Sequence, residues 1–423
     1  MTARRKRPQS GDGEPTITAS SQGDGHKWEF KARFRHHAFG WKSQPAITRI
    51  KQAVAEIKKV ARKHPALAAE GAIVFLERVS PALEHVDSSS GSIGTAVNNA
   101  IAELVPLVAG ASVDIRTRDA WLERLWEAHA ADQIPYIERL ADDWGELCGS
   151  KEIASAWGDR LLGITRTALS PDKSLRGHFH GTTACLSALF RAERHQDILD
   201  LLVTETFWPY RRWAVKALAA MGKRAEAMRL AESSRGPWTH DGDVDRICEG
   251  ILLSSGLVDE AYERYGLIAN QGGTYLATFR AVSKKYPHKA ASQILADLVK
   301  TTPGDEGKWF AAAKEAGLYD EALALASRTP CDPKTLARAA RDYAEKQPPF
   351  AVSAGLLALH WLVQGCGYEI TSADVWDAYR STLAAAERLG GAAEARERIR
   401  KMVAAEGAGE RFVTKVLGRE LGL

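Results

Sequence analysis

The sequence predicts an all-α fold, a right-handed solenoid of antiparallel helical hairpins, and this prediction rests on a short repeated pattern. Each copy is an apolar helix, a turn of small residues or Gly, and a second helix that opens with an acidic residue and Ala. Three of the turns contain Gly222, Gly256 and Gly317. A period in the low thirties is typical of stacked helical hairpins. The four copies cover residues 185–203, 213–231, 248–266 and 309–327.

The physical chemistry of the turn explains this pattern. Gly is favoured at a helix end because a residue without Cβ adopts the left-handed conformation at little cost. The acidic residue that follows, such as Glu226 or Glu321, meets the positive end of the next helix dipole. The intervals between the three glycines are 34 and 61 residues, so the second leaves room for a degenerate copy near residues 286–290. One hairpin cannot cover its own apolar face, so we expect consecutive hairpins to stack.

Part of the repeat resembles the tetratricopeptide class, in which Gly, an aromatic residue two places later and then Ala mark the junction between two helices. Gly317, Tyr319 and Ala322 match this run, and the copy with Gly256 and Tyr265 matches part of it. The Trp, Leu and Gly marks of the first helix and the closing Pro are not in register. We therefore describe the repeat as tetratricopeptide-like.

A second resemblance rests on the runs Phe39-Gly40-Trp41, 86–91, Trp144-Gly145, 274–279 and 307–313. These runs are similar to those of uncharacterised bacterial helical-repeat proteins, some of which are associated with SWIM-type zinc fingers. The resemblance covers roughly residues 28–388 and implies a bacterial helical protein without an established activity. The zinc-finger motif itself is missing, since the chain has no Cys-x-x-Cys pair.

Charge is divided unevenly along the chain. The net charge is +4, but residues 1–64 hold fifteen Lys or Arg and five Asp or Glu, so they carry +10 and the remaining chain carries −6. A basic arm on a mildly acidic body favours contact with polyanions. Residues 1–27 are predicted to be a disordered basic tail, because they are polar and contain no apolar block.

Composition indicates a soluble protein, and we expect it in the cytoplasm. Apolar residues make up 45% of the chain and charged residues 26%. The sequence shows no signal-peptide core, and no apolar stretch reaches the ~20 residues of a membrane span; residues 351–363 are the most apolar. The five cysteines are scattered singly, which argues against a disulfide framework.

We expect four regions: the tail at 1–27, an N-terminal helical region with a basic-aromatic arm at 28–170, tetratricopeptide-like repeats at 181–346 and a C-terminal helical cap at 347–423. A polar loop at 171–181 joins the second region to the third. Pro348-Pro349 is expected to break the chain ahead of an apolar helix, and Thr371 to Asp374 is typical of a helix start. Other helices are expected at 46–62, 65–86, 93–108, 118–131, 135–147, 152–169, 392–405 and 410–421.

Four polar clusters lack part of the pattern that their chemistry requires. The Gly- and Ser-rich run 88–94 has no Lys of a phosphate-binding loop. The alternating carboxylates at 241–245 would need a bidentate Glu where Leu252 stands, so a calcium loop is excluded. The run 178–185 offers two His and one Cys without a fourth ligand, and the His pair at 36–37 is weaker still. We expect no catalytic residues, no metal site and no cofactor, and hence no enzyme.

A partner-binding site is predicted where aromatic residues and arginines open the second repeat, at residues 207–213. Such residues dominate interaction hot spots because they desolvate large surfaces and keep a directed polar tip. The alternative is that the aromatic rings pack between adjacent hairpins with Arg at the rim. The candidate partner-binding residues are Trp208, Tyr210, Arg211 and Arg212.

A nucleic-acid-binding site is the alternative prediction, and it rests on the basic-aromatic arm at 27–42. Bases that stack on aromatic rings while Lys and Arg bind phosphates are typical of single-strand binding. Equally, the aromatic residues can anchor the arm on the first helices while the charges stay in water. The candidate residues are Lys27, Trp28, Phe30, Lys31, Arg33, Phe34 and Arg35.

Three functions follow from these observations. The leading hypothesis is a non-enzymatic scaffold that binds a peptide or protein partner in a solenoid groove, since the repeat has no accompanying catalytic motif. The first alternative is a nucleic-acid-binding protein that uses the arm. The second is a hydrolase with an unrecognised site between repeats, because catalytic groups can meet in space without meeting in sequence.

Overall fold

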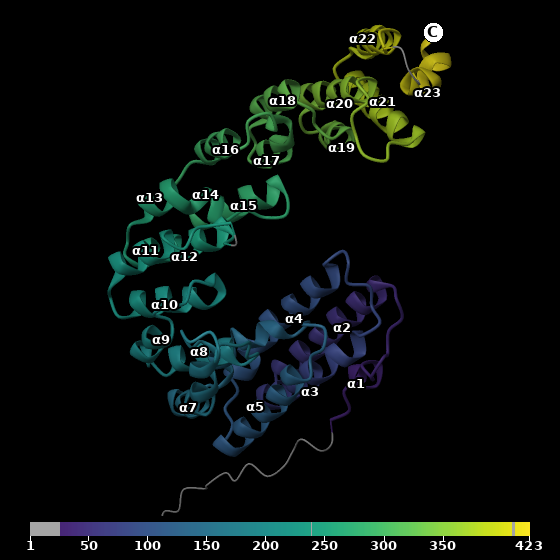
Figure 1. Cartoon of the computed structure of the whole chain (residues 1–423). Helices are drawn as coiled ribbons and strands as arrows, with labels where there is room; N and C mark the ends of the chain where they lie inside the picture. Colours follow the sequence, from purple (N-terminus) through teal and green to yellow (C-terminus); the bar gives the residue numbers. More distant parts are fainter. Residues whose placement is uncertain (1–25, 238, 408–410) are drawn as a thin grey trace, which may run out of the picture. The chain divides into compact units, whose positions relative to one another are not determined.

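The protein is built of α-helices. The computed structural model describes residues 26–237, 239–407 and 411–423, and within them it contains helices and no strand (Figure 1). The predicted all-α class is therefore confirmed. The chain divides into two compact units, Met1–Ala227 (unit 1) and Met228–Leu423 (unit 2). The predicted disordered tail lies outside the described residues except for its last two positions.

Unit 1 begins with a short helix and a loop that occupy the arm, whose secondary structure the sequence left open. Helix α11 (Arg224–Glu232) contains the boundary between the units. The helices before it are α1 (Glu29–Arg33), α2 (Ser43–Ala61), α3 (Pro65–Leu83), α4 (Ser92–Ala109), α5 (Ile115–Ala130), the 3₁₀ turn η1 (Glu138–Ala141), α6 (Trp144–Leu147), α7 (Lys151–Ala168), α8 (Thr182–Arg191), α9 (His195–Leu201) and α10 (Trp208–Ala220).

The first core of unit 1 forms where α2, α3 and α4 pack against one another. Helix α3 is buried on most sides, because its apolar residues recur on more than one face. Gly71 on α3 allows a close approach: a Cβ there would lie 2.3 Å from Cζ2 of Trp28. Phe30 and Phe34 pack edge-on against Phe75 of the same helix, at ring-centroid distances of 5.9 and 5.2 Å. The arm is thereby fastened to α3.

A buried arginine joins three helices of unit 1. Arg118 on α5 is 5% exposed. Its guanidinium donates to the carbonyl oxygens of Val108, Ala111 (2.6 Å) and Leu147 (3.3 Å). These carbonyls lie at the C-terminal ends of α4 and α6 or just beyond, where the helix dipole is negative. Burial lowers the pKa of Arg118, but an arginine stays charged in proteins, so the carbonyls replace its lost hydration.

Unit 2 is a succession of helix pairs. Its elements are α12 (Asp241–Ser254), α13 (Val258–Ala261), the π-helical turn η2 (Tyr262–Gly266), α14 (Leu267–Ala269), α15 (Tyr275–Lys285), α16 (Ala291–Lys300), the 3₁₀ turn η3 (Glu306–Trp309), α17 (Phe310–Glu315), α18 (Tyr319–Arg328), α19 (Pro333–Tyr343), α20 (Pro348–Val363), α21 (Ser372–Glu387), α22 (Ala392–Ala404) and α23 (Phe412–Leu421). Helices two places apart also touch, as α18 with α20 and α19 with α21 do.

The glycine turns have the left-handed conformation that the repeat pattern predicts. The φ angles are +80° at Gly222, +77° at Gly256 and +74° at Gly317. In each turn the next residue donates its N–H to the carbonyl five residues earlier, which is the Schellman arrangement. These bonds run from Lys223 to Leu218 (2.9 Å), from Leu257 to Leu252 (3.0 Å) and from Leu318 to Ala313 (3.0 Å).

Two further helix pairs follow, of which only the second has the left-handed glycine turn. Helices α15 and α16 meet at residues 286–290, where the degenerate copy was predicted, so a helix pair does occupy that interval. Helices α21 and α22 meet at Gly390, whose φ is +70°. Glu394 and Ala395 follow Gly390 at the spacing that Glu226 and Ala227 have from Gly222. This copy lies inside the region that we predicted to be the terminal cap.

Two predicted helix boundaries are wrong. Residues 135–147 form η1 and α6 instead of one helix, because a carboxylate oxygen of Asp132 accepts the N–H of Ile137 at 2.8 Å and holds a turn ahead of η1. Pro348-Pro349 does not precede the apolar helix but forms the first turn of α20, where no intrahelical donor is needed. The start at Thr371 is confirmed, since Thr371 and Asp374 form a capping box.

A buried carboxylate joins three segments of unit 2. Glu249 on α12 is 0% exposed. It accepts hydrogen bonds from the hydroxyl of Tyr286 (2.5 Å) and the amide of Asn270 (2.6 Å), and it pairs with Lys285 (2.5 Å). Buried charges require such partners, because an isolated carboxylate in an apolar interior is strongly disfavoured. Glu249 thus fixes α12 to the end of α15.

Helix α4 is long and apolar enough to cross a membrane by length and composition. The sequence analysis did not single it out. Its apolar side packs on α2 and α3, while Thr95, Asn99 and Glu103 are exposed at intervals of one helical turn. Core helices and signal sequences meet the same criteria, and 39% of α4 is buried inside the structure.

Candidate functional site

The predicted partner-binding residues open helix α10, and most of them are packed. Trp208 is 5% exposed, and Tyr210, Arg211 and Arg212 are half-buried. Arg212 forms an ion pair with Asp142, the residue that follows η1. The structure therefore brings these side chains into the helix packing of unit 1. The ring of Trp208 is buried, as the packing alternative expects, and its role in partner binding stays a prediction.

The aromatic residues of the arm are also packed. Trp28, Phe30 and Phe34 are all buried. Their rings cover α3 in this structure, as the anchoring alternative expects, and base stacking by these rings stays a prediction. The basic candidates Lys27, Lys31, Arg33 and Arg35 are exposed.

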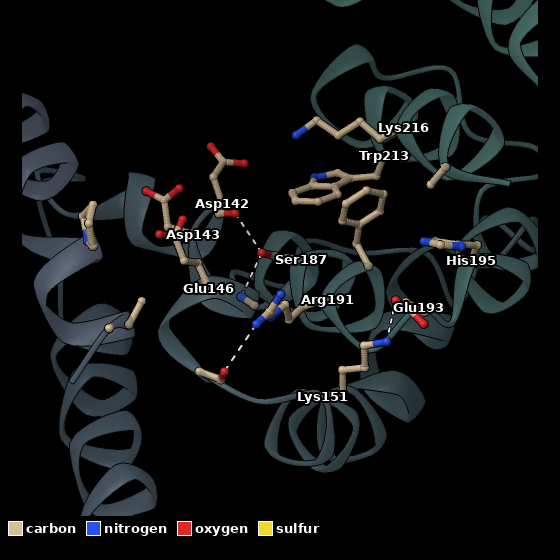
Figure 2. A pocket seen from close by; sticks show the side chains of 17 residues that line it. Asp142, Asp143, Glu146, Lys151, Ser187, Arg191, Glu193, His195, Trp213 and Lys216 are labelled. Carbon is tan, nitrogen blue, oxygen red and sulfur yellow. Dashed lines mark hydrogen bonds and ion pairs between the residues drawn. The ribbon is translucent and has the colours of Figure 1, made fainter. Parts of the chain in front are cut away.

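A groove in unit 1 is the candidate functional site, and it lies beside the predicted residues without including them. It has a volume of about 1360 Å³ and is open to solvent along one side. Its walls come from the end of α4, the start of α6, the ends of α7 and α8 that face it, and the middle of α10 (Figure 2). The side chains that carry its chemistry are Asp142, Asp143, Glu146, Lys151, Ser187, Phe190, Arg191, Glu193, His195, Trp213 and Lys216.

The close contact of α6 with α8 shapes the floor of the groove. Gly145 has no Cβ, and one placed there would lie 2.3 Å from the carbonyl oxygen of Ser187. The Ser187 hydroxyl accepts the N–H of Gly145 at 3.0 Å and donates to the carbonyl of Asp142 at 2.7 Å. These bonds satisfy donors and acceptors that the short helix α6 leaves unpaired. Asp142 and Asp143 are thereby held at the rim.

Aromatic rings line the part of the groove formed by α8 and α10. Phe190 and Trp213 meet at a ring-centroid distance of 5.8 Å, and Phe190 also contacts His195 at 5.3 Å. The ammonium of Lys216 lies 4.1 Å from the centre of the Trp213 ring, a cation–π contact. The groove therefore combines an apolar surface with charged groups at its edges.

Charged side chains of both signs line the groove, with Arg191 between the acidic residues near α6 and the side chains of α10 (Figure 2). Asp143 and Glu146 stand on the side of α6, and Lys216 stands on the side of α10. These three side chains form no ion pair with any residue that the structure describes. Lys151 and Glu193, by contrast, form an ion pair at 2.5 Å. Unpaired charges of opposite sign on two walls favour an occupant that itself carries both signs.

Three groups in the groove have shifted pKa values, and one of them is Glu193, whose pKa is lowered by its hydrogen bond and ion pair with Lys151. Burial raises the pKa of the Asp143 carboxyl, and the adjacent carboxylates of Asp142 and Glu146 raise it further against the opposing effect of Arg139. Burial also lowers the pKa of Lys216, and Arg212 adds to this shift. Shifted pKa values are frequent at functional sites and also occur in structural charge networks. For Asp143 and Lys216 the shifts mark charged groups that lost water and form no ion pair in the described chain, although each weakly stabilises the charge of the other.

Sequence reasoning missed the groove because its walls come from helices that are far apart in the chain. Two signals were nevertheless present. Trp144-Gly145 was noted as a run, and Gly145 is the residue that permits the α6 contact. Trp213 was placed on the apolar face of its helix, and it is 3% exposed at the groove wall.

No family model, no curated protein and no solved structure matches the chain.

Proposed function

We propose that the chain is a non-enzymatic scaffold whose helix pairs form a right-handed solenoid in each unit, and that unit 1 holds a peptide segment of a partner protein in its groove. Support for the solenoid comes from the recurring left-handed turn and from contacts between helices two places apart, such as α2 with α4 and α20 with α22. Resemblance to tetratricopeptide hairpins agrees with this architecture. The proposed location is the cytoplasm.

The observation that carries the peptide proposal is the size and openness of the groove together with its separated charges. At about 1360 Å³ it exceeds the about 300–1,000 Å³ that is typical of small-molecule pockets. Phe190 and Trp213 supply apolar contact, while Asp143, Glu146 and Lys216 supply charges that form no ion pair in the described chain. An extended peptide that places an acidic residue at Lys216 and a basic residue at Asp143 and Glu146 pairs with all three charges.

Affinity capture with groove variants tests this proposal. The full chain is used as bait against lysate, and captured proteins are identified by mass spectrometry. The double variant Asp143→Lys and Glu146→Lys reverses the charge of the acidic wall. We therefore expect the captured amount of each specific partner to fall at least tenfold. The matched control Asp200→Lys changes an exposed carboxylate of α9 outside the groove and is expected to retain them.

Two results would overturn the proposal. The first is a wild-type chain that captures no specific protein at any salt concentration. The second is a set of partners that bind the groove variant and the Asp200→Lys control equally. Circular dichroism of each variant establishes that the helices are intact, which separates a lost site from a lost fold.

Nucleic-acid binding is the second candidate, and the basic surface of α1 and α2 favours it. Between residues 26 and 63 eleven Lys or Arg are exposed, while the same segment holds the acids Glu29 and Glu56. A hollow of about 530 Å³ between α2 and α4 collects several of these bases. With the aromatic rings buried, such a surface would contact phosphates without stacking. The bases at the hollow are Lys51, Lys58, Lys59 and Arg62.

An electrophoretic shift assay separates this candidate from the first. Phosphate contact predicts similar affinity for single- and double-stranded probes and a steep loss of affinity with salt. The double variant Lys51→Glu and Lys59→Glu is expected to weaken binding at least tenfold. The double variant Lys173→Glu and Lys223→Glu changes exposed lysines elsewhere in unit 1 by the same charge and serves as the control. Equal binding by both double variants would show that the bases of α2 do not bind the nucleic acid.

A further inference from the structure

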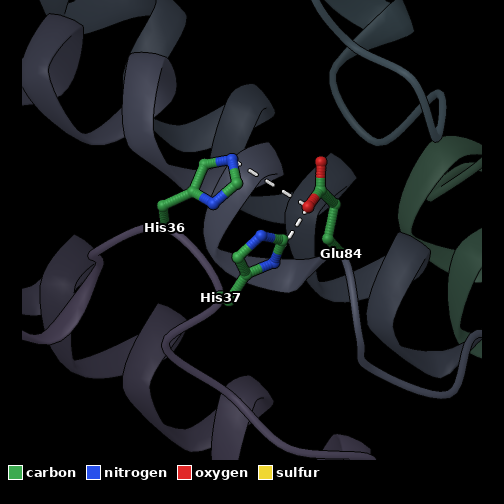
Figure 3. A group of neighbouring side chains, drawn as sticks. All are labelled: His36, His37 and Glu84. Carbon is green, nitrogen blue, oxygen red and sulfur yellow. Dashed lines mark ion pairs between the residues drawn. The ribbon is translucent and has the colours of Figure 1, made fainter.

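The loop between α1 and α2 brings two histidines to a glutamate at the end of α3. His36 and His37 lie in this loop, and Glu84 is the residue that follows α3 (Figure 3). Nδ1 of His37 is 2.9 Å from Oε2 of Glu84, and Nε2 of His36 is 3.9 Å from the same oxygen. One ligand atom from each of the three residues lies within 4.8 Å of the others.

The backbone holds this group in place. His37 has a φ of +54°, a left-handed conformation that is unfavourable for a residue with Cβ. Its N–H donates to the carbonyl of Pro81 on α3 at 3.0 Å. The flanking ring of Phe34 is buried in the core, and the imidazole of His85 stacks on His37 with 4.4 Å between ring centroids. The two loop histidines are thus presented by a fixed segment.

Two imidazoles and one carboxylate are the ligand set of many zinc sites with an open coordination position. Zinc binds these ligands at about 2.0–2.2 Å, so neighbouring ligand atoms in a tetrahedron lie about 3.4 Å apart. The two measured spacings, 2.9 and 3.9 Å, are on either side of this value. The side chains retain access to solvent, with 63% of His36, 42% of His37 and 30% of Glu84 exposed, so an ion can enter.

We propose that His36, His37 and Glu84 bind one divalent transition-metal ion, with zinc as the best match to the ligand set. The ion ties the α1–α2 loop to the end of α3. It replaces the contact between Glu84 and the histidines by three metal–ligand bonds. The fourth position is left to water or to a group from another molecule. In sequence the His pair gave only a weak indication of a metal site, and its third ligand, Glu84, lies 47 residues after His37.

Isothermal titration of zinc chloride into the full chain, stripped by a chelator and returned to chelator-free buffer, tests the site. We expect one ion per chain for the wild type. The variants His37→Ala and Glu84→Gln each remove a ligand and are expected to weaken binding at least tenfold. His64→Ala removes an exposed histidine at the start of α3 and is the matched control, with wild-type affinity expected. Cys366→Ser tests the most accessible thiol and should also leave affinity unchanged.

A thermal readout distinguishes a real site from loose surface binding. A ligand that binds only the folded chain raises its melting temperature. We expect zinc to raise the melting temperature of the wild type and of His64→Ala, and not that of His37→Ala. The proposal is wrong if the wild type shows no saturable binding, if binding is lost in Cys366→Ser, or if the His37 and Glu84 variants bind as the wild type does. Circular dichroism confirms that each variant retains its helices.

Discussion

Unit 1 and unit 2 each bury a charged side chain where several segments meet, but they satisfy it in different ways. In unit 1, backbone carbonyls at the ends of α4 and α6 surround Arg118. In unit 2, the side chains of Asn270, Lys285 and Tyr286 surround Glu249. Carbonyls are present whatever the sequence, whereas side-chain donors require particular residues. The first arrangement depends on where helices end, and the second on which residues the next helix pair carries.

Removing Arg118 is expected to have the largest effect, because the carbonyls around it lose the guanidinium that donates hydrogen bonds to them. We expect Arg118→Met to lower the free energy of unfolding of unit 1 by about 3–5 kcal/mol, because it leaves several buried carbonyls without a donor and each such group costs about 1–3 kcal/mol. Urea unfolding followed by hydrogen exchange in α4 and α5 measures it. Arg116→Met, an exposed arginine of the same helix, should change stability little.

Changing Glu249 is expected to have a smaller effect, since a side chain of the same shape retains part of the network. In Glu249→Gln the carbonyl still accepts from Tyr286, while Lys285 is partly exposed and can turn to water. We expect a loss of about 1–3 kcal/mol in unit 2. Hydrogen exchange in α12 and α15 is the measurement, with exposed Glu263→Gln as the control. A loss as large as that of Arg118→Met would contradict the contrast between the units.

The glycine turns are a feature that the two units share, so equal effects are expected there. Gly222→Ala in unit 1 and Gly317→Ala in unit 2 each place a Cβ on a left-handed residue, and each should destabilise by about 1–2 kcal/mol. Gly163→Ala, in the exposed part of α7 with open space around it, should stabilise by about 0.5–1 kcal/mol. Local hydrogen exchange compares the three. Unequal losses at Gly222 and Gly317 would show that the turns are not equivalent.

The loss of stability at low pH is also expected to differ between the units, with a smaller effect than those above. Burial lowers the pKa of His129 in unit 1, and neighbouring His180 lowers it further. The unfolded chain then takes up a proton at higher pH than the folded chain, so stability falls as the pH drops through about 6.5. We expect His129→Gln to flatten the fall in stability of α5 between pH 7 and pH 5. His288→Gln in unit 2 is the control, and an equal flattening in both would contradict the assignment.

Local chemistry made the helices and their turns predictable, and distance in the chain hid the sites. Gly222, Gly256 and Gly317 indicated their turns because the left-handed conformation selects Gly. The copy at Gly390 carried the same signal and was overlooked. The groove could not be predicted, since it depends on how α4, α6, α8 and α10 pack. The scattered positions of the cysteines argued against a disulfide framework. The structure agrees, since Cys148, Cys185, Cys248 and Cys331 are free and buried.

Length can change in this architecture by whole hairpins. Each left-handed turn is closed by a hydrogen bond from the residue after the Gly to a carbonyl of the preceding helix, so it needs no residue from any other hairpin. A gene that duplicates or loses one hairpin therefore leaves every remaining connection unaltered, provided that the newly adjacent apolar faces still match. Insertions and deletions of about one repeat are thus the length variations that natural selection can most readily retain in proteins built this way.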